Sequence, residues 1–297
     1  MKKVTVLLST YNGEKFIKHQ IQSLLAQRGV DLQIVIRDDG STDETIRILK
    51  SFNNNKIKII KSNENLGPAK SFINLLNIVG DSDYYAFCDQ DDYWEENKLL
   101  VSISKLEKIK STSGKLYISS LNVTDSNLNT IYVTQLLDSA ESNPAMVRNQ
   151  ATGCTMVFDK ILKNNFVKHN FNVITMHDSF IYKYAILCHA SVYLDNNSYI
   201  KYRQHSNNTL GMTNNFIKSI QIKLNRVLHS DYDASQSAKE FLKKMKLNDY
   251  NVEYLDCLVN YKKDLKKKLK LLTKFMIKTN YSGSKINYVI KILINKI

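Results

Sequence analysis

Acidic side chains gather after one apolar segment in a pattern that suits a divalent cation. The run Asp89–Asp92, with the sequence Asp-Gln-Asp-Asp, follows directly after Tyr84–Cys88, which has the length and composition of a buried strand. Carboxylates this close together repel one another unless a cation or hydrogen bonds compensate. Because Mg²⁺ and Mn²⁺ prefer oxygen ligands, the segment predicts a metal held against a substrate diphosphate. A solvated acidic turn or a helix start is the alternative that the sequence leaves open.

Two more polar segments follow apolar runs nearer the N-terminus. Residues 37–43 come after Leu32–Ile36, and a carboxylate there could accept an N–H from a pyrimidine base; a turn that caps the next helix is the alternative. Residues 9–12 come after Val4–Leu8 and could contact the base or the ribose. Because open parallel sheets bind ligands at the carboxyl ends of their strands, three such segments at one edge favour a binding site.

Two pairs of residues farther along the chain could take part in the same chemistry. Asp178 follows His177 at the start of a helical stretch, where an aspartate serves either as a capping residue or as a general base. Arg203 and His205 stand on alternate residues, so both could face one phosphate or metal. A surface strand with a stray histidine is the simpler interpretation of the second pair.

The elements that must position these residues alternate between strand and helix patterns. The runs Val4–Leu8, Leu32–Ile36, Lys56–Ile60 and Tyr84–Cys88 are separated by segments with helical spacing of apolar residues. This order predicts right-handed βαβ crossovers and a mostly parallel sheet in an α/β domain over residues 1–213. We expect a basic helical region over residues 214–297, where Leu, Ile and Lys dominate.

The charge of the chain is concentrated in that C-terminal region. Of the net charge of +14, residues 1–213 contribute 24 Lys and Arg against 21 Asp and Glu, and residues 214–297 contribute 18 against 7. The amphipathic pattern around Lys262–Leu272 predicts contact with an anionic membrane. A helix packed on the α/β domain and a dimer contact are the alternatives. Nucleic-acid binding is disfavoured, because the lysines over residues 262–278 have no interleaved aromatic residue apart from Phe275, and no recognition motif is present.

Several classes of protein are disfavoured by what the sequence lacks. It contains no GxxxxGK(S/T) loop, no GxGxxG fingerprint and no GxSxG elbow, which disfavours P-loop NTPases, nicotinamide dehydrogenases and α/β-hydrolases. Its 4 cysteines are widely spaced, so we expect reduced thiols rather than a disulfide framework or a zinc site. The N-terminal apolar run is shorter than a secretory signal, and no run is long enough for a transmembrane helix. These features predict a cytoplasmic protein.

Taken together and in this order, the motifs resemble those of glycosyltransferase family 2, which has the GT-A fold, a Rossmann-like central sheet flanked by helices. The wording of the later motifs is similar to the bacterial rhamnosyltransferase branch. The segments that carry the resemblance are LLSTYNGEKFI (7–17), IRDDGSTDETI (36–46), NLGPAKSF (65–72), FCDQDDYWEENKL (87–99), TGCTMVF (152–158), MHDSF (176–180) and YRQHSNN (202–208).

The resemblance implies a role for each matching residue. Asp178 matches the catalytic base of an inverting enzyme. The metal ligands implied are Asp89, Asp91 and His205. The nucleotide-sugar contacts implied are Thr10, Tyr11, Asn12, Glu14, Asp38, Asp39, Lys70, Asp89, Gln90 and Arg203. The acceptor contacts implied are Trp94, Gly153, Cys154 and His177. The chain departs from the branch after His177-Asp178, where it has Ser179 and Phe180 instead of the usual tryptophan.

The resemblance also implies an activity. We expect a Mg²⁺- or Mn²⁺-dependent inverting glycosyltransferase that moves L-rhamnose from dTDP-rhamnose to a lipid-linked glycan acceptor in capsule, cell-wall or O-antigen synthesis. A UDP-hexose or UDP-N-acetylhexosamine donor is the alternative, and a non-catalytic protein that binds nucleic acid or membrane is a distant one. The expected location is the inner face of the cell membrane, with peripheral contact and a homodimer as a further option.

Overall fold

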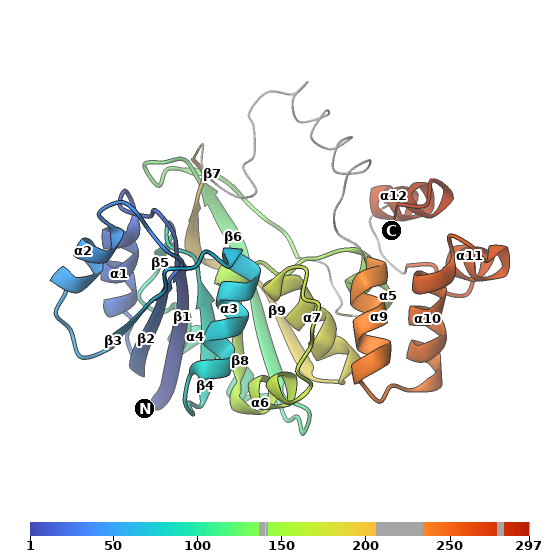
Figure 1. Cartoon of the computed structure of the whole chain (residues 1–297), viewed down its shortest axis with the longest axis horizontal. Helices are drawn as coiled ribbons and strands as arrows, with labels where there is room; N and C mark the ends of the chain where they lie inside the picture. The colour runs from blue at the N-terminus through green and yellow to red at the C-terminus, as the bar shows by residue number, and fades with distance from the viewer. Residues whose placement is uncertain (137–139, 141, 206–233, 278–281, 297) are drawn as a thin grey trace.

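A single curled sheet of nine strands organises the computed structural model of this chain (Figure 1). The structure describes residues 1–136, 140, 142–205, 234–277 and 282–296. The strand order is β3-β2-β1-β4-β8-β6-β9-β5, and β7 pairs with β6 outside this path. Helices flank the sheet, and further helices from the C-terminal part of the chain lie beyond one side of it.

The first half of the sheet is parallel, as the strand–helix alternation predicts. Its strands are β1 (Lys2–Thr10), β2 (Val30–Asp38), β3 (Ile57–Lys61) and β4 (Tyr84–Cys88). Thr10 is in register with Asp38, and Leu8 with Cys88. The polar segments after β1, β2 and β4 therefore meet at one edge of the sheet, which confirms the arrangement inferred from the sequence.

Helices cover both faces of this half, because apolar residues alternate along β1. Val6 and Leu8 belong to the core that contains residues of α1 and α4, whereas Leu7 belongs to the core that contains residues of α3. The crossover helices are α1 (Ile17–Leu25), α2 (Thr45–Ser51), α3 (Gly67–Ile78) and α4 (Lys98–Glu107). Burial on both faces leaves the strand ends as the place for a ligand.

The second half of the sheet is mixed. Its strands are β5 (Tyr93–Trp94), β6 (Lys115–Thr124), β7 (Thr130–Val133), β8 (Val157–Asp159) and β9 (Ser191–Arg203). β8 runs antiparallel to both β4 and β6, and β9 runs parallel to β6. β5 pairs antiparallel with β9, and β7 pairs antiparallel with β6. The expectation of a mostly parallel sheet thus describes the N-terminal half, since segments as short as β5 and β8 carry too few residues to indicate a direction.

The C-terminal region is helical, as expected. Its helices, and those that precede it, are α5 (Ser142–Val147), α6 (Lys160–Lys168), α7 (His177–Leu187), α9 (Ala234–Lys244), α10 (Asp249–Asn260), α11 (Leu265–Leu272) and α12 (Ser282–Leu293), with a 3₁₀ turn η1 at Gly153–Thr155. Phe241 of α9 lies against Phe180 of α7, with ring centroids 4.5 Å apart. The helices therefore continue the core of the α/β domain. The expected boundary at residues 213 and 214 lies outside the described residues.

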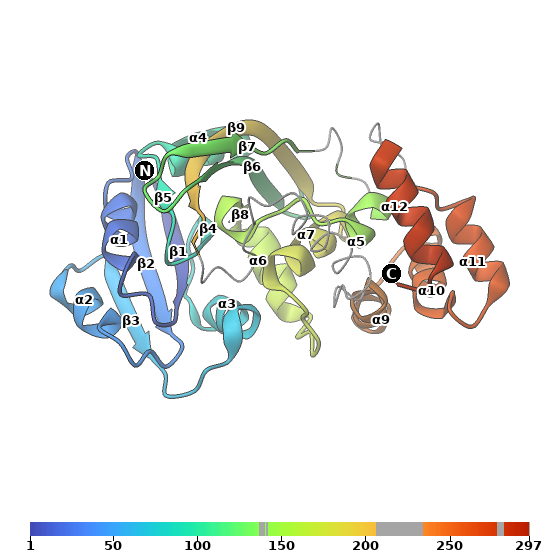
Figure 2. The same ribbon diagram turned by 90° about the horizontal axis from the view of Figure 1, so that it is seen from above.

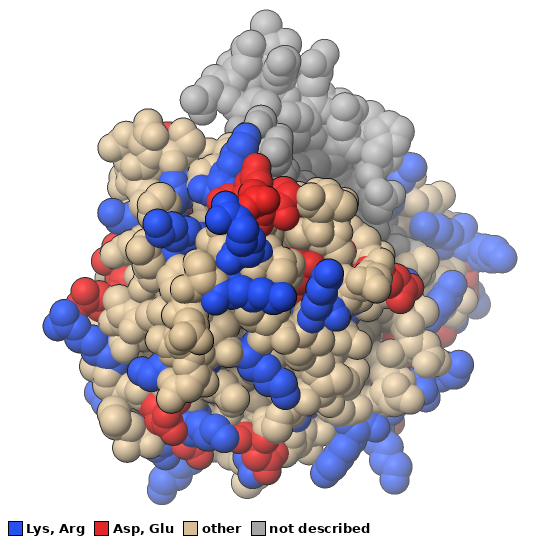
Figure 3. All heavy atoms as spheres, turned by 60° about the vertical axis from the view of Figure 1, so that its left-hand side comes forward, with Lys and Arg blue, Asp and Glu red and all other residues tan. Residues whose placement is uncertain are grey.

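Basic and acidic side chains lie interspersed on the face of the molecule that Figure 3 shows. This agrees with the nearly balanced charge of residues 1–213. Within the described ranges, none of the helices combines the length and the hydropathy needed to cross a bilayer.

Gly114, just before β6, provides a test of the fold away from the strand ends. Its φ is +110°, and an added Cβ would lie 2.7 Å from the backbone nitrogen of Leu162. We expect Gly114→Ala to lower the free energy of unfolding by about 1–3 kcal/mol, because strain and overpacking add. Gly80→Ala is the matched control, since nothing lies within 4 Å of its added Cβ. Urea unfolding measures both, and equal stabilities would contradict the packing described here.

Candidate active site

A cavity of about 330 Å³ opens where β1, β2 and β4 end. Four of its acidic residues come from three separate parts of the chain: Asp39 after β2, Asp89 and Asp91 after β4, and Asp178 in α7. The remaining lining residues are Ser9, Tyr11, Asn65, Gly67, Pro68, Phe72, Gln90, Asn149, Thr152, Gly153, Met176, His177 and Tyr202. The predicted convergence of carboxylates in one cavity is therefore present.

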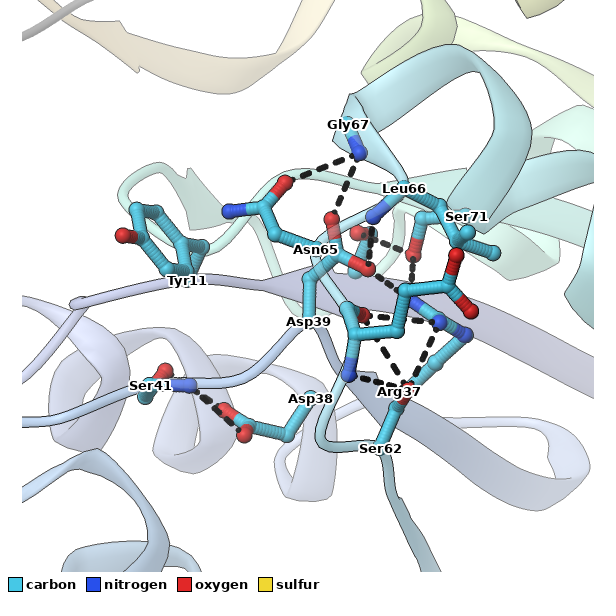
Figure 4. Close-up of polar contacts among 12 residues, drawn as sticks. Tyr11, Arg37, Asp38, Asp39, Ser41, Ser62, Asn65, Leu66, Gly67 and Ser71 are labelled. Atoms are coloured by element: carbon cyan, nitrogen blue, oxygen red, sulfur yellow. Dashed lines mark hydrogen bonds and ion pairs between the residues drawn. The ribbon is translucent and has the colours of Figure 1, made fainter.

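Asp39 is fixed at one side of this cavity by an ion pair and a helix start (Figure 4). Its carboxylate is paired with the buried guanidinium of Arg37. It also accepts the backbone N–H groups of Leu66 at 3.0 Å and Gly67 at 2.8 Å, so that it caps the N-terminus of α3. A carboxylate can accept about four hydrogen bonds. One acceptor position therefore remains for a donor in the cavity.

The end of β1 is tied to the acidic segment by Gln90. The Gln90 Oε1 accepts the Thr10 hydroxyl at 2.6 Å and the Tyr11 N–H at 2.9 Å, and its Nε2 donates to the Tyr11 carbonyl at 3.1 Å. Thr10 is buried and lies outside the cavity lining. These hydrogen bonds use the polar groups of Thr10 and Gln90, so the structure gives both residues a positioning role. The half-exposed Tyr11 lines the cavity.

Other predicted nucleotide contacts fasten the neighbouring loops to each other. Asn12 accepts the Thr42 N–H at 2.9 Å, and Glu14 accepts the Glu44 N–H at 3.0 Å. Asp38 is completely buried and accepts both the N–H and the hydroxyl of Ser41. The cavity lining includes none of Asn12, Glu14 and Asp38. It also excludes Lys70, which is exposed on α3.

Two of the three aspartates after β4 line the cavity. Asp89 and Asp91 line the cavity, whereas Asp92 is buried and accepts the backbone N–H of Arg203 at 3.1 Å. Burial and the charges of Asp91 and Asp178 raise the pKa of Asp89 to about 7. Burial and the charges of Asp91 and Asp89 likewise raise the pKa of Asp92. The segment thus carries more negative charge than its surroundings compensate.

Arg203 and His205 hold this acidic segment from the end of β9. The Arg203 Nε donates to the Asp91 carbonyl at 2.8 Å, and its Nη1 donates to the Ser126 carbonyl. Its guanidinium lies over the Phe16 ring, 4.7 Å from the centroid. The His205 ring packs on the same Phe16 at 4.6 Å, and its Nε2 lies 2.8 Å from Asp91 Oδ2. Arg203 is therefore a positioning residue rather than a wall of the cavity.

A buried lysine lies behind the acidic segment. Lys98 is completely buried, with its Nζ 3.6 Å from the centroid of the Trp94 ring. Burial lowers the pKa of Lys98 to about 8, although the nearby Cys154, Cys88 and Asp92 oppose the shift. Trp94 and Cys154 are also completely buried and do not line the cavity. The structure packs both side chains in the core, and their acceptor contacts stay predictions.

Asp178 sits opposite the acidic segment, in the first turn of α7. Its carboxylate accepts the N–H of Gly153 at 3.1 Å and that of Ser179 at 2.5 Å. Burial raises the pKa of Asp178 to about 6, against the effect of these hydrogen bonds. The neighbouring His177 stacks on Phe72, with centroids 4.1 Å apart, and burial lowers its pKa to about 3. His177 is therefore a neutral packing residue that borders the cavity.

Gly153 is required where it stands, beside both of these residues. An added Cβ would lie 2.7 Å from the His177 Nε2 and 3.6 Å from the Asp178 Cβ. The close approach lets the Gly153 N–H reach the Asp178 carboxylate. The TGC segment quoted from the sequence thus contributes a glycine that orients an acid, whereas its cysteine is packed in the core.

Reasoning from the sequence left out a number of residues that line the cavity. Asn65, Gly67 and Pro68 belong to a quoted motif that follows β3 at the same edge, so position alone could have indicated them. Gly67 has a φ of +74°, which favours glycine at this turn. Five others also lie inside quoted motifs, whereas Asn149 lies outside all of them: Ser9, Phe72, Thr152, Met176 and Tyr202.

The residues present suit a hard divalent cation. Asp89 and Asp91 offer carboxylate oxygens to the cavity, and the raised pKa of Asp89 indicates that a positive charge is lacking there. Among the residues that the structure describes, Asp89, Asp92 and Cys154 form the one group of three candidate ligands within 4.8 Å of each other. The Cys154 thiol is soft and its pKa is raised by burial, so it suits Mg²⁺ or Mn²⁺ poorly. The proposed set of Asp89, Asp91 and His205 stays a prediction.

The arrangement can bind a base at one end, a charged group in the middle and a nucleophile at the other end. Asp39 offers an acceptor position, the acidic segment can hold a cation, and Asp178 can accept a proton. Such a sequence of groups suits the transfer of a group from a nucleotide to an acceptor.

Comparisons with known proteins agree with this geometry. The sequence profile described as Glycosyl transferase family 2 matches residues 5–180. The dTDP-rhamnosyl transferase RfbG of Shigella flexneri is 33% identical over 227 residues, covering 70% of this chain and 75% of that protein. The UDP-Glc:alpha-D-GlcNAc-diphosphoundecaprenol beta-1,3-glucosyltransferase WfaP of Escherichia coli is 34% identical over 120 residues, covering 40% of this chain and 47% of that protein.

A solved structure supports the fold. The crystal structure of S. aureus TarS 1-349 in complex with UDP-GlcNAc has a TM-score of 0.56 to this chain. The likeness covers 98% of this chain and 90% of the other at 17% sequence identity. It shows that the fold is that of the GT-A glycosyltransferases.

The brace formed by Arg203 can be tested through stability. We expect Arg203→Lys to lower the free energy of unfolding by about 1–3 kcal/mol, because an ammonium cannot reproduce the fork that reaches the carbonyls of Asp91 and Ser126. Arg47→Lys is the matched control, since Arg47 is exposed and paired only with Glu44 on the surface. Chemical denaturation measures both. A loss no larger for Arg203→Lys than for the control would contradict the bracing role.

Proposed function

This chain belongs to glycosyltransferase family 2, and from that premise we propose that it transfers L-rhamnose from dTDP-rhamnose to a glycan acceptor with inversion at the anomeric carbon. The observation that carries the proposal is the meeting of Asp39, Asp89, Asp91 and Asp178 in one cavity. The similarity to a dTDP-rhamnosyl transferase over most of both chains supports the choice of donor.

The nucleotide end of the donor is proposed to bind between Tyr11 and Asp39. Thymine and uracil both carry an N–H donor, which suits the remaining acceptor position of the Asp39 carboxylate. The half-exposed Tyr11 ring offers a surface for stacking. Arg37 and the start of α3 hold the Asp39 carboxylate in the orientation that this contact needs.

The diphosphate is proposed to bind next to Asp89 and Asp91, with Mg²⁺ or Mn²⁺. When bound, the metal supplies positive charge that offsets the negative charge developing on the leaving diphosphate. The chain itself contributes the two carboxylates, and Arg203 and Gln90 hold the backbone that carries them. His205 is the third proposed ligand, since its ring already contacts Asp91.

Asp178 is proposed as the general base. It accepts the proton of an acceptor hydroxyl, whose oxygen attacks the anomeric carbon while the bond to the diphosphate oxygen breaks. One displacement inverts the configuration and releases the nucleoside diphosphate. The N–H groups of Gly153 and Ser179 fix the orientation of the carboxylate, and the cavity aligns the reactants.

A UDP-hexose or UDP-N-acetylhexosamine donor is the second candidate. The similar WfaP is named for a UDP-Glc donor, and the similar TarS structure holds UDP-GlcNAc. The mechanism proposed above is the same for either donor, so the difference lies in the base and sugar alone.

The acceptor is proposed to be a lipid-linked glycan in the synthesis of a surface polysaccharide. Support comes from WfaP, whose name gives a diphosphoundecaprenol-linked acceptor. An enzyme with such an acceptor works at the cytoplasmic face of a membrane by peripheral contact. The expectations of no nucleic-acid partner and of a possible homodimer stay predictions.

Donor choice can be tested with a panel of sugar nucleotides. We expect metal-dependent release of dTDP from dTDP-rhamnose to exceed release from UDP-glucose, UDP-galactose and UDP-N-acetylhexosamines by about tenfold or more, a difference typical of a site that reads one donor. Nucleoside diphosphate release measures this directly. Preferred turnover of a UDP-sugar would overturn the rhamnose donor and favour the second candidate.

Two variants serve as controls for the same assay. Asp178→Asn removes the proposed base, and Asp91→Ala removes a proposed metal ligand. We expect each variant to lower the rate of transfer by about 100-fold or more, with an unchanged circular dichroism spectrum. Near-normal turnover in either variant would contradict its assigned role.

The dependence of the rate on pH tests the base. Burial raises the pKa of Asp178 to about 6, and only the ionised carboxylate can accept a proton. We therefore expect kcat/KM, at saturating Mn²⁺, to be level above this pH and to fall as the pH drops through about 6. Metal binding must be followed in parallel, because the pKa of Asp89 is also raised, to about 7. A rate that stays level down to about pH 4, the range of an ordinary aspartate, would contradict the assignment.

A further inference from the structure

Helices α11 and α12 expose a stripe of aliphatic side chains to solvent. On α11, Leu265 is 71% exposed and Leu269 is 53% exposed. On and just after α12, the exposed members are Ile286, Ile290, Leu293 and Ile294, between 42% and 59%. These six residues are called the aliphatic stripe below. Aliphatic side chains left exposed in this number on two neighbouring helices indicate an interaction surface.

The stripe belongs to firmly packed helices rather than to loose chain ends. The opposite side of α12 is buried through Tyr288 and Ile292, and that of α11 through Leu271. All three belong to the main hydrophobic core. The Lys268 Nζ on α11 donates to the Leu293 carbonyl and to the Asn295 side chain, each at 3.0 Å, and so joins the two helices. The stripe is therefore presented as one surface.

The structure also revises which lysines of α11 are available. The amphipathic pattern of the sequence suggests one basic outer face, but three of its lysines are engaged in ion pairs. Lys267 pairs with Asp256 at 2.7 Å, and Lys270 and Lys274 both pair with Glu253 of α10. These pairs attach α11 to α10. The exposed aliphatic side chains of α11 thus lie among lysines, some of which are engaged in these ion pairs.

The bordering charge is of one sign. Lys262, Lys263, Lys266, Lys285 and Lys296 are exposed around the stripe. The sequence contains no Asp or Glu after Asp264, whose half-buried carboxylate caps α11. An apolar strip with cationic borders suits the boundary between the headgroups and the acyl chains of an anionic bilayer. A second copy of the same surface would bring lysines against lysines, which like-charge repulsion disfavours.

The position of the stripe suits an acceptor held in a membrane. In Figure 1, α12 lies at the upper end of the molecule, the end at which the parallel strands finish, and Figure 2, viewed from above, shows it in front of α10. The cavity lies at those strand ends. A bilayer in contact with α12 would therefore face the same end of the molecule as the cavity.

We propose that the aliphatic stripe inserts into the interface of an anionic membrane and docks this chain there. The benefit of such docking, access to a lipid-linked acceptor, rests on the proposed function. The membrane-binding surface rests on the exposure, packing and charge of the residues described above. Each buried aliphatic side chain contributes to binding in proportion to the apolar area removed from water, and the bordering lysines contribute by attraction to anionic lipid.

The test is flotation of the full chain with vesicles that contain phosphatidylglycerol, compared with pure phosphatidylcholine vesicles. We expect partitioning onto the anionic vesicles, and a loss of about tenfold or more in the double variant Ile286→Ser with Ile290→Ser. The matched control is Ile78→Ser with Ile161→Ser, which removes two similarly exposed aliphatic residues from α3 and α6. Its partitioning should stay within about twofold of the unaltered chain.

Two further readouts separate the possible outcomes. Turnover in the absence of vesicles, measured as nucleoside diphosphate release, should be unchanged in the stripe variant. Loss of membrane binding and loss of the proposed function are therefore distinguishable. Sedimentation reports the oligomeric state. Equal flotation of the two double variants, no binding to anionic vesicles by the unaltered chain, or a stripe variant that changes only the oligomeric state would each overturn the proposal.

Discussion

The repulsion among carboxylates at one edge of the sheet is the constraint on which this site depends. Four aspartates line a single cavity, and each needs compensation to stay there. Asp39 obtains it from Arg37 and the start of α3, and Asp178 obtains it from two backbone N–H groups. Asp91 contacts His205. Asp89 is the least compensated, with its pKa raised to about 7, and this is where a cation would complete the balance.

The two halves of the sheet divide the work of the site. The parallel half supplies the residues proposed to bind the nucleotide and diphosphate, because β1, β2 and β4 end at the same edge. The mixed half brings in β9 and η1, which carry Tyr202, Arg203 and Gly153 to the same cavity or to its supports. Several polar side chains near the site form hydrogen bonds that join its segments to one another. Gln90 ties the acidic segment to β1, and Arg203 ties it to β9.

The helical C-terminal region is continuous with this framework. Its inner side shares the core of the α/β domain through residues such as Phe241 and Tyr254, and its outer side carries the aliphatic stripe. The lysines are accordingly divided between ion pairs with α10 and the border of the stripe. A region that reads as uniformly basic in the sequence therefore has two chemically different sides.

The sequence by itself determined the strand–helix alternation and the place of the polar segments, because apolar periodicity and strand ends are local features. It thereby located Asp39, Asp89, Asp91 and Asp178 correctly in one cavity. Only the tertiary structure decided which neighbours face that cavity. Successive side chains of an extended segment point to opposite sides, and long-range partners claim polar groups, so Thr10 is bound to Gln90 while Trp94 and Cys154 enter the core. Such contacts join residues distant in the chain, and no local pattern records them.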